Sequence, residues 1–298
     1  MVSKLKKFIN RLRKYKVFND FLFHLSFIKA NKYIPNFKNP KTYNEKINYR
    51  KRNADNDLFS ICSDKLEVKS WVVDKGFSDI VIENYYVDDN IEFDTLKSII
   101  TDKGDVLLKA NHNSGPVYLL TKSCSDEKIK AACADVNNQL TKDYGKLQGE
   151  PWYSNIKPKV LVEKRIAPEI GEKDLKDYKF HVFKQDDGTS KVILHVDIDR
   201  NTNHNRSFFD EELNWLPFSL EYPMIRTTLD KPNNYAKMLN IAKDLSKPFS
   251  YVRVDLYNVN GVIYFGELTF AHGSGTEVFS DQSYDKWMGN VWQCDPKD

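Results

Sequence analysis

The chain has 298 residues, enough for one large domain or two ordinary domains with proper cores. Its formal net charge of +3 is close to neutral, so composition does not indicate a nucleic-acid-binding protein. No apolar run reaches membrane-spanning length, and the N-terminus lacks the core and cleavage site of a signal peptide. The four cysteines form no CxxC or Cys/His pattern, which is typical of reduced cytosolic thiols rather than a disulfide framework or a zinc site.

Residues 1–16 form a basic segment that contains no acidic residue. Apolar residues recur in it at the spacing of one helix face, namely at Leu5, Phe8, Ile9, Leu12 and Tyr15. The pattern predicts a basic amphipathic helix, which the aromatic stretch 18–27 follows. Such a helix lies on an anionic membrane surface or packs on its own domain with its lysines outward. The sequence leaves both alternatives open, and nucleic-acid binding is a weaker third because no basic recognition motif accompanies the segment.

The rest of the chain changes from a helix-rich first third to a β-rich remainder. Helices are expected at 64–76, 95–100, 125–145 and 233–245, and strands at 106–109, 160–163, 178–184, 192–199 and in a hairpin at 250–270. Gly76 suits a helix C-terminus and Ser125 an N-cap. Antiparallel hairpins interspersed with helices indicate an α+β architecture rather than a doubly wound parallel sheet.

The most informative segment is the expected hairpin at 250–275. It carries Asp255 on one strand, and Glu267 and Thr269 on the other. Two carboxylates and a small oxygen donor suit Mg²⁺, which takes oxygen ligands and shares its shell with substrate phosphates. Arg253 lies two residues before Asp255, so on a strand it shares that face and is placed to meet phosphates or an acidic substrate.

The parity of this hairpin decides whether the carboxylates meet. A two-residue turn at 260–261 would pair Asp255 with Gly266 and turn Glu267 to the opposite face. A three-residue loop at 259–261 would pair Asp255 with Phe265 and make Glu267 its diagonal neighbour. The metal hypothesis therefore needs the longer loop or a bulge. Otherwise the two acids are solvated carboxylates on an edge hairpin.

Two further segments suit a nucleotide. Lys109 ends a short strand and precedes a polar loop of five residues: Asn111, His112, Asn113, Ser114 and Gly115. A strand-end lysine and loop N–H groups suit phosphate contact, although neither a Walker A loop nor GxGxxG is present. Glu163 ends an apolar strand of the kind that holds adenine. Each of these residues alone is equally an ordinary surface or core residue.

Two polar groups in the β-rich part are candidates for substrate contact. Lys179 and His181 share one face of a strand, where burial would be costly unless they meet an anion. His181 is a candidate catalytic base. Arg200, His204 and Arg206 lie in an expected loop that would bind an acidic group, although a polar surface loop explains them as well.

In this order the segments resemble the TupA-like branch of the ATP-grasp superfamily. The resemblance runs from about residue 64 to 292 and is carried by VLLKANHNSG (106–115), VLVEKRI (160–166), DYKFHVF (177–183) and YVRVDLYNVNGVIYFGELTF (251–270). It implies two α+β lobes that grip ATP between antiparallel sheets. It divides the chain into a basic N-terminal segment (1–60), the start of the catalytic region (61–105), and the nucleotide-binding and catalytic lobes (106–298).

The resemblance also implies roles for the candidate residues. Lys109 and the loop 111–115 would contact the ATP phosphates, and Lys179 would make a second phosphate or adenine-side contact. The adenine and ribose would be held by Glu163, Lys164 and Ile166. One or two Mg²⁺ would be bound by Asp255 and Glu267, with Thr269 where ATP-grasp enzymes often have an asparagine.

The chemistry implied by the resemblance is ATP-dependent ligation of a carboxylate to an amine through an acyl phosphate, with Lys109 and Arg253 offsetting the charge on the transferred group. The expected substrates are a uronic acid of a bacterial surface polysaccharide or its precursor, and an amino acid or amino alcohol. A cytoplasmic enzyme, peripheral on the membrane through residues 1–30, would fit this role. A glycosyltransferase, for which Asp197-Ile198-Asp199 is a DxD match, and a non-catalytic membrane scaffold are the alternatives.

Overall fold

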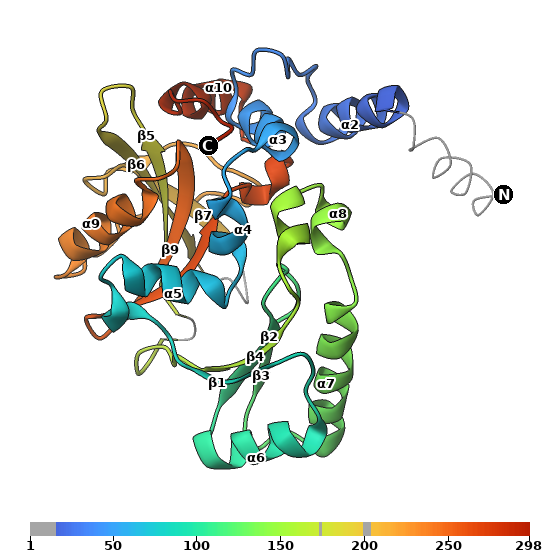
Figure 1. Ribbon diagram of the computed structural model, residues 1–298. Coiled ribbons are helices and arrows are strands. Elements are labelled where there is room, and N and C mark those ends of the chain that lie inside the picture. The colour runs from blue at the N-terminus through green and yellow to red at the C-terminus, as the bar shows by residue number, and fades with distance from the viewer. Residues whose placement is uncertain (1–15, 173–174, 199–203) are drawn as a thin grey trace.

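The computed structural model describes residues 16–172, 175–198 and 204–298, with only the backbone given for 16–19. Two lobes are visible in Figure 1, each built around one antiparallel sheet. Each sheet has its own cluster of buried apolar side chains. The α+β architecture expected from the sequence is confirmed.

The smaller lobe contains a four-stranded sheet covered by two helices (Figure 1). The strand order is β1 (Asn84–Asp88), β4 (Val160–Lys164), β2 (Val106–Ala110) and β3 (Tyr118–Leu120). Helices α6 (Phe93–Lys103) and α7 (Asp126–Leu140) pack against each other, and α7 packs on β2 and β4. The Ser125 side chain accepts a hydrogen bond from the backbone N–H of Lys128, which confirms the predicted N-cap. The prediction that this helix continues to Gly145 is wrong: it ends at Leu140, and Gly145 lies in the separate helix α8 (Tyr144–Gln148).

The larger lobe contains a six-stranded sheet. Its strand order is β10 (Val262–Thr269), β9 (Tyr251–Val259), β5 (Asp177–Lys184), β6 (Ser190–Ile198), β7 (Asn205–Phe209) and β8 (Trp215–Leu216). Helix α9 (Tyr235–Ser246) covers one face, where Tyr235 packs on Phe180. Helix α3 (Tyr43–Asn53) lies over the other face, where Tyr43 packs on Tyr251. Strand β5 is buried along almost its whole length, as expected for a strand covered on both faces.

The N-terminal helices belong physically to the larger lobe. Helix α3 packs on α10 (Gln282–Val291) and on the short turn η3 (His272–Gly275), and α4 (Leu58–Ser63) packs on β10. Arg50 of α3 is fully buried and donates to the carbonyl oxygens of Tyr251 (2.8 Å) and Asp298 (2.8 Å). This guanidinium therefore ties α3 to the sheet and to the end of the chain.

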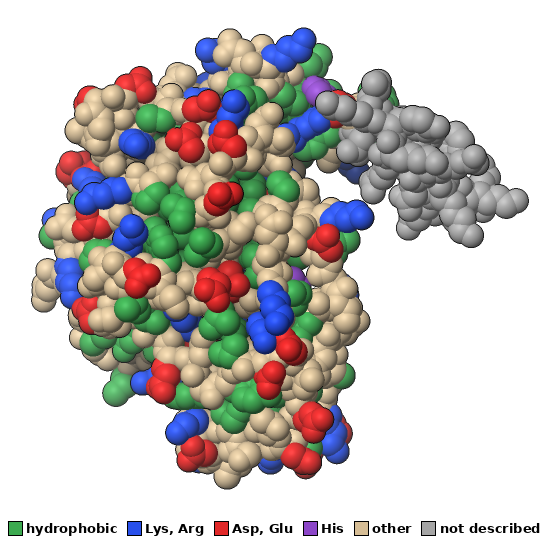
Figure 2. Space-filling model, in the orientation of Figure 1, with side chains coloured by type: hydrophobic (Ala, Val, Ile, Leu, Met, Phe, Trp, Pro, Cys, Tyr) green, Lys and Arg blue, Asp and Glu red, His purple; other side chains and the backbone are tan. Residues whose placement is uncertain are grey.

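Two shorter helical pieces and two longer helices complete the described chain. They are α2 (Lys16–Asn31), α5 (Glu67–Asp74), η1 (Ser78–Ile80) and η2 (Pro151–Asn155). Helix α5 ends in a Schellman motif, in which Gly76 has φ of 89° and its N–H bonds to the Val73 carbonyl, as its sequence predicted. Most of the predicted basic helix lies in residues 1–15, outside the described residues. None of the described helices combines the length and apolarity needed to cross a membrane. On the face shown in Figure 2, acidic and basic side chains are interspersed.

The β9–β10 hairpin resolves the parity question through a bulge. Its turn has two residues, Asn260 (φ 50°) and Gly261 (φ 78°), as a type I′ turn requires. The register then shifts between Phe265 and Glu267, so that Glu267 pairs directly with Asp255. The hairpin therefore has the two-residue turn rather than the three-residue loop, and a bulge at Gly266 brings the two carboxylates onto one face. A Cβ added at Gly266 would lie 3.0 Å from the Asp255 carbonyl oxygen.

A bulky side chain at position 266 should therefore destabilise the hairpin. We expect Gly266→Val to lower the free energy of unfolding by about 1–3 kcal/mol, because the β-branched side chain must displace the Asp255 backbone and the Tyr257 ring. Urea denaturation followed by circular dichroism measures the change. Val262→Ala, at a position on the same strand that is 47 % exposed, is the control and should change stability by less than about 0.5 kcal/mol. Equal stability of the two variants would contradict the requirement for glycine.

Candidate active site

A cavity of about 450 Å³ lies between the two sheets. The smaller sheet contributes residues of β2 and β4, and the larger sheet contributes residues of β5, β9 and β10. The polar residues predicted from the sequence that line it are Lys109, Ser114, Gly115, Glu163, Lys164, Lys179, Arg253, Asp255 and Glu267, with Ile166 beside them. Segments as far apart in the chain as Lys65 and Glu267 thus meet at one cavity, as a site for a ligand held between two lobes requires.

On the smaller lobe, Glu163 lies between two lysines. Its carboxylate oxygens lie 2.7 Å from Lys109 Nζ and 2.6 Å from Lys69 Nζ. The Lys69 ammonium also donates to the Ile82 carbonyl oxygen (2.7 Å) and to Asn84 Oδ1 (2.6 Å). Burial opposes ionisation of Glu163, but the charges of Lys109 and Lys69 outweigh it and hold the pKa of Glu163 below its usual range. The cluster therefore presents a fixed cation at the cavity wall.

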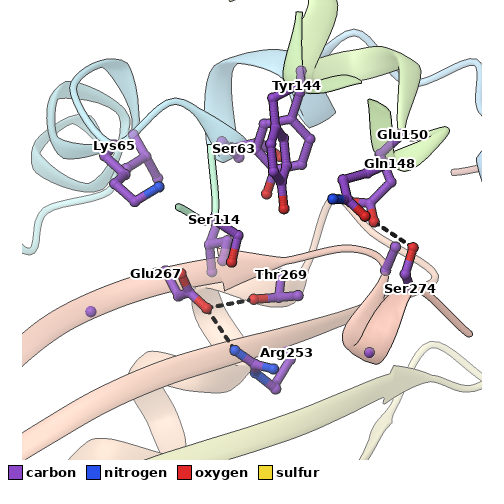
Figure 3. Close-up of a pocket in the computed structure, with 17 residues that line it drawn as sticks. Ser63, Lys65, Ser114, Tyr144, Gln148, Glu150, Arg253, Glu267, Thr269 and Ser274 are labelled. Carbon is purple, nitrogen blue, oxygen red and sulfur yellow. Dashed lines mark hydrogen bonds and ion pairs between the residues drawn. The ribbon is translucent and has the colours of Figure 1, made fainter. Parts of the chain in front are cut away.

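On the larger lobe, Arg253 joins the two predicted metal ligands. Its Nε and Nη2 atoms lie 2.7 Å from the two oxygens of Asp255, and Nη2 lies 2.6 Å from Glu267 Oε1. Thr269 Oγ1 donates to the same Glu267 oxygen at 2.9 Å (Figure 3). Burial raises the pKa of Asp255 to about 7, against the opposing charge of Arg253. Burial also acts to raise the pKa of Glu267, but Arg253 and Lys65 outweigh it and lower that pKa.

This donor set fits a hard divalent cation. Asp255 and Glu267 are direct partners on neighbouring antiparallel strands, so their side chains emerge on the same face of the sheet. Carboxylate oxygens are the ligands that Mg²⁺ takes together with phosphate oxygens and water. The guanidinium between the two carboxylates shows that this place accommodates positive charge. The Thr269 hydroxyl is hydrogen-bonded to Glu267, so it positions that carboxylate rather than acting as a separate ligand.

Residues 45–293 match the family model described as TupA-like ATPgrasp. The chain belongs to this family. The match starts in α3 and ends just beyond α10, so it covers both lobes and confirms the family that the sequence motifs indicated. No curated protein matches the chain.

Solved structures of ligases are similar to this TupA-like chain at low identity. D-alanine–D-alanine ligase from Helicobacter pylori is 15 % identical, with 78 % of this chain and 60 % of that chain covered and a TM-score of 0.48. D-alanyl-alanine synthetase A from Vibrio cholerae O1 biovar eltor is 12 % identical, with 70 % and 55 % covered and a TM-score of 0.43. The ATP-grasp ligase PsnB, solved with a minimal precursor, Mg and ADP, is 12 % identical, with 72 % and 52 % covered and a TM-score of 0.38. The chain spans less than two thirds of the length of each of these proteins.

The polar loop after β2 in this TupA-like chain contributes mainly backbone and small residues to the cavity. Asn111 is fully buried and donates to Asp64 Oδ1 (2.9 Å), and His112 Nε2 lies 3.1 Å from the Lys142 carbonyl oxygen. Asn113 donates to Gln139 Oε1 (2.9 Å). These three side chains shape the loop from behind, whereas Ser114 and Gly115 line the cavity.

The sequence analysis missed two lysines: Lys65, which lines the cavity, and Lys69, which pairs with Glu163 behind it. Lys69 lies in α5, and Lys65 just before it, far along the chain from the strands that they face. The Lys65 ammonium donates to the Asn113 carbonyl oxygen, and burial lowers the pKa of Lys65 to about 8. Figure 3 places Lys65 on the wall across from Glu267. The one signal in the sequence that could have indicated Lys69 is Glu163, an acid in an otherwise apolar strand. Such an acid requires a cationic partner if the strand is buried.

The remaining predicted residues lie away from the cavity wall, with the exception of Lys179. The Lys179 ammonium pairs with Asp177 and lies 3.4 Å from Asp197. His181 is fully buried among aromatic rings, with Nδ1 2.9 Å from the Tyr251 hydroxyl, and burial lowers its pKa well below the usual value. This position places a neutral imidazole beneath the site. Its role as a catalytic base stays a prediction.

The predicted acid-binding loop is wrong for Arg206, which lies in strand β7, and the described charged residues of this segment form internal pairs. Arg200 lies outside the described residues. His204 Nε2 lies 2.9 Å from Asp197 Oδ1, and Arg206 Nε lies 3.0 Å from the same oxygen. Asp197 is also the first acid of the DxD match. Its carboxylate is thus paired with cationic side chains and histidines of the protein, which disfavours the metal-binding role that a glycosyltransferase DxD motif would have.

A second chamber of about 260 Å³ opens beside the first. The two share five lining residues: Lys65, Ser114, Arg253, Gly266 and Glu267. In Figure 3, Tyr144, Gln148 and Glu150 stand on the wall opposite β9 and β10. Glu150 is 8 % exposed, accepts a hydrogen bond from Ser274 Oγ (2.9 Å), and forms no ion pair with any residue that the structure describes. Burial raises the pKa of Glu150. The chamber therefore offers hydrogen-bond acceptors and donors to a small polar molecule.

The Glu163 cluster generates a test of stability and its pH dependence. Glu163→Gln leaves Lys69 and Lys109 facing each other without their anion, so we expect the free energy of unfolding at pH 7 to fall by about 3 kcal/mol or more. The folded-state pKa of Glu163 is lowered, so its contribution is present above the unfolded pKa of about 4.3 and is lost as the pH falls through the folded value. The difference between wild type and variant should shrink as the pH is lowered from 7 to below about 4.

Urea denaturation at a series of pH values measures this difference. Lys97→Met is the control, because it breaks the exposed pair with Asp126 and should cost less than about 1 kcal/mol. A Glu163→Gln variant as stable as the control would show that the two lysines do not depend on this carboxylate.

Proposed function

We propose that this protein is an ATP- and magnesium-dependent carboxylate–amine ligase that releases ADP. The observation that carries the proposal is the cavity between the two sheets, where two opposed carboxylates and Arg253 face a wall that carries Lys65 and Lys109. Membership of the ATP-grasp family supports the same activity. A polyanion held with a divalent cation is the ligand that this distribution of charge suits best.

In this proposal the cavity holds ATP with its phosphates between the lobes. Lys109, which pairs with Glu163, and Lys65 contact phosphate oxygens together with the backbone around Ser114 and Gly115. The base lies against the apolar side of the cavity near Ile166, where Glu163 and the backbone of Lys164 provide polar contacts. Lys179 makes a further contact from the larger lobe.

Asp255 and Glu267 would hold Mg²⁺, which when bound offsets phosphate charge and orients the phosphoryl group. Thr269 keeps the Glu267 carboxylate in place through its hydrogen bond. Arg253 stands where negative charge develops on the carboxylate substrate and the transferred group. The protein thus supplies position and electrostatic stabilisation, which is the usual contribution in phosphoryl transfer.

The proposed reaction has two steps. An oxygen of the substrate carboxylate attacks the γ-phosphorus, the bond to ADP breaks, and an acyl phosphate forms. The amine nitrogen then attacks the acyl carbon, phosphate leaves, and the proton of the amine passes to the departing phosphate. The second chamber joins the first at Arg253 and Glu267, so it is placed to hold the substrate at the point of transfer.

We further propose that the carboxylate belongs to a uronic acid of a bacterial surface polysaccharide or its precursor, and the amine to an amino acid or amino alcohol. The hydrogen-bonding lining of the second chamber, which includes Tyr144, Gln148 and Glu150, supports a small hydroxylated or amine-bearing ligand. A screen of sugar acids and amines for ADP release tests this assignment. Absence of ADP release with every sugar acid, but release with another carboxylate class, would overturn it.

Nucleotide binding is the first outcome to test. ADP with Mg²⁺, at about one hundred times its dissociation constant, should raise stability by roughly 2.7 kcal/mol, whereas UDP-sugars should have no effect. Thermal unfolding of the purified chain with each ligand and with EDTA measures this. Glu267→Gln should remain folded, lose the magnesium dependence of the ADP shift, and reduce turnover at least about a hundredfold. A shift with UDP-sugars alone would favour the glycosyltransferase instead.

We also propose that the N-terminal segment holds the enzyme on an anionic membrane at the cytoplasmic face. The support is the basic segment 1–16 followed by α2, on which Phe21 and Leu25 are exposed. The protein should float with vesicles that contain anionic lipid, less so at high salt, and not with neutral vesicles. Replacing Lys6, Lys7 and Arg11 with glutamate should abolish flotation. Unchanged flotation of that variant would exclude this segment as the membrane contact.

A further inference from the structure

Arg253 occupies the space between the two carboxylates that suit a metal ion. Its Nη2 atom lies 2.7 Å from Asp255 Oδ2 and 2.6 Å from Glu267 Oε1, and its Nε atom lies 2.7 Å from Asp255 Oδ1. The side chain is 9 % exposed. A cation that took one oxygen from each carboxylate would therefore compete with an ion pair that the protein already makes.

A second arrangement holds Arg253 from behind. Its Nη1 atom lies 2.6 Å from His272 Nδ1, and because a guanidinium only donates, that ring nitrogen must be the unprotonated one. The ring proton is then on Nε2, which lies 3.0 Å from Glu277 Oε2. Glu277 is fixed in turn by Arg206 Nη1 at 2.7 Å. The negative charge of Glu277 thus lies beside the protonated nitrogen of His272 and favours this tautomer, and His272 helps to position the guanidinium.

The contacts of His272 also decide whether it forms a metal site with the neighbouring histidines. His181, His195 and His272 offer ring nitrogens within 4.8 Å of one another, as in a metal site. However, one nitrogen of His272 accepts from Arg253 and the other faces Glu277. No lone pair of His272 is left for a metal. His272 therefore serves to hold Arg253, and the three histidines do not form a separate metal site.

The charge around the cavity makes the competition matter. The ionisable side chains that line it are Lys65, Lys109, Lys164, Lys179 and Arg253 on the basic side, and Glu163, Asp177, Asp255 and Glu267 on the acidic side. The protein alone therefore offers a divalent cation no excess of negative charge. Nucleotide phosphates would supply that excess and would also give the guanidinium new acceptors.

We propose that Arg253 is an internal counter-ion that makes cation binding at Asp255 and Glu267 depend on the nucleotide, with His272 and Glu277 as its positioning residues. The inference rests on the proposed function for the identity of the nucleotide site. The guanidinium keeps both carboxylates paired and in register, and the cation binds tightly only as a complex with phosphate. Free divalent cations are thereby kept out of the site.

The test measures binding of Mn²⁺, a paramagnetic probe, to the full chain with and without ADP by electron paramagnetic resonance. Wild type should bind Mn²⁺ at least about tenfold more tightly with ADP than without it. Arg253→Gln should raise the affinity for Mn²⁺ without ADP by about tenfold or more, whereas Arg253→Lys should remain close to wild type. Glu277→Gln, which leaves Arg253 in place but loosens its support, should give a smaller increase in the same direction.

Lys109→Met is the matched control. It removes one positive charge from the same cavity, but Lys109 contacts Glu163 and not Asp255 or Glu267. Its affinity for Mn²⁺ without ADP should stay within about twofold of wild type. An equal gain in this variant would show that net charge alone controls the cation and would overturn the counter-ion role. Where ADP does produce a thermal shift, equally tight Mn²⁺ binding by wild type with and without ADP would also overturn the counter-ion role.

The two proposals fail in different ways. If ADP produces no thermal shift, the proposed nucleotide function fails, while the comparison of wild type and Arg253→Gln without ADP still decides the counter-ion role. If ADP binds but Arg253→Gln leaves Mn²⁺ affinity unchanged, only the counter-ion role fails. Circular dichroism of each variant confirms that the comparison is made between folded proteins.

Discussion

The bidentate ion pair between Arg253 and Asp255 is the interaction on which the rest of the site depends. Both side chains are less than a tenth exposed, and a carboxylate removed from water is stable only when a cation or several hydrogen bonds replace its hydration. The planar guanidinium meets Asp255 with two parallel hydrogen bonds and reaches Glu267 across the strand boundary. One side chain therefore fixes the direction of both acids, and with them the shape of the cavity wall.

The facing wall also contains buried ion pairs, but there positive charge exceeds negative charge. Glu163 is the single anion between Lys69 and Lys109, so one positive charge remains after the pairing. Lys65 adds another at the junction of the two chambers, where it donates to the backbone carbonyl oxygen of Asn113. A cavity with fixed acids on one wall and surplus cations on the other suits a metal-bound polyanion better than either a free cation or a free anion.

The sequence predicted the helices and strands well but did not predict which charged side chains pair with each other, and both outcomes have physical reasons. Helix α7 and strand β2 carry their apolar residues at the periods of a helix and a strand, and the Ser125 cap marks a boundary. The partnership of Lys69 with Glu163 spans 94 positions and leaves no trace in local spacing. Likewise, nothing in the polar loop after β2 distinguishes Asn111, which supports the loop, from Ser114, which lines the cavity.

The bulge at Gly266 reconciles two demands that otherwise conflict. A two-residue type I′ turn matches the twist of antiparallel strands and is the favoured connection, and Asn260-Gly261 provides it. With that turn, the two-residue period of a strand would place Asp255 and Glu267 on opposite faces of the sheet. One inserted residue restores a common face, and glycine there avoids the close contact that a Cβ would make with the Asp255 carbonyl oxygen. The hairpin thus keeps its most stable turn, and the irregularity lies where the chemistry needs both carboxylates.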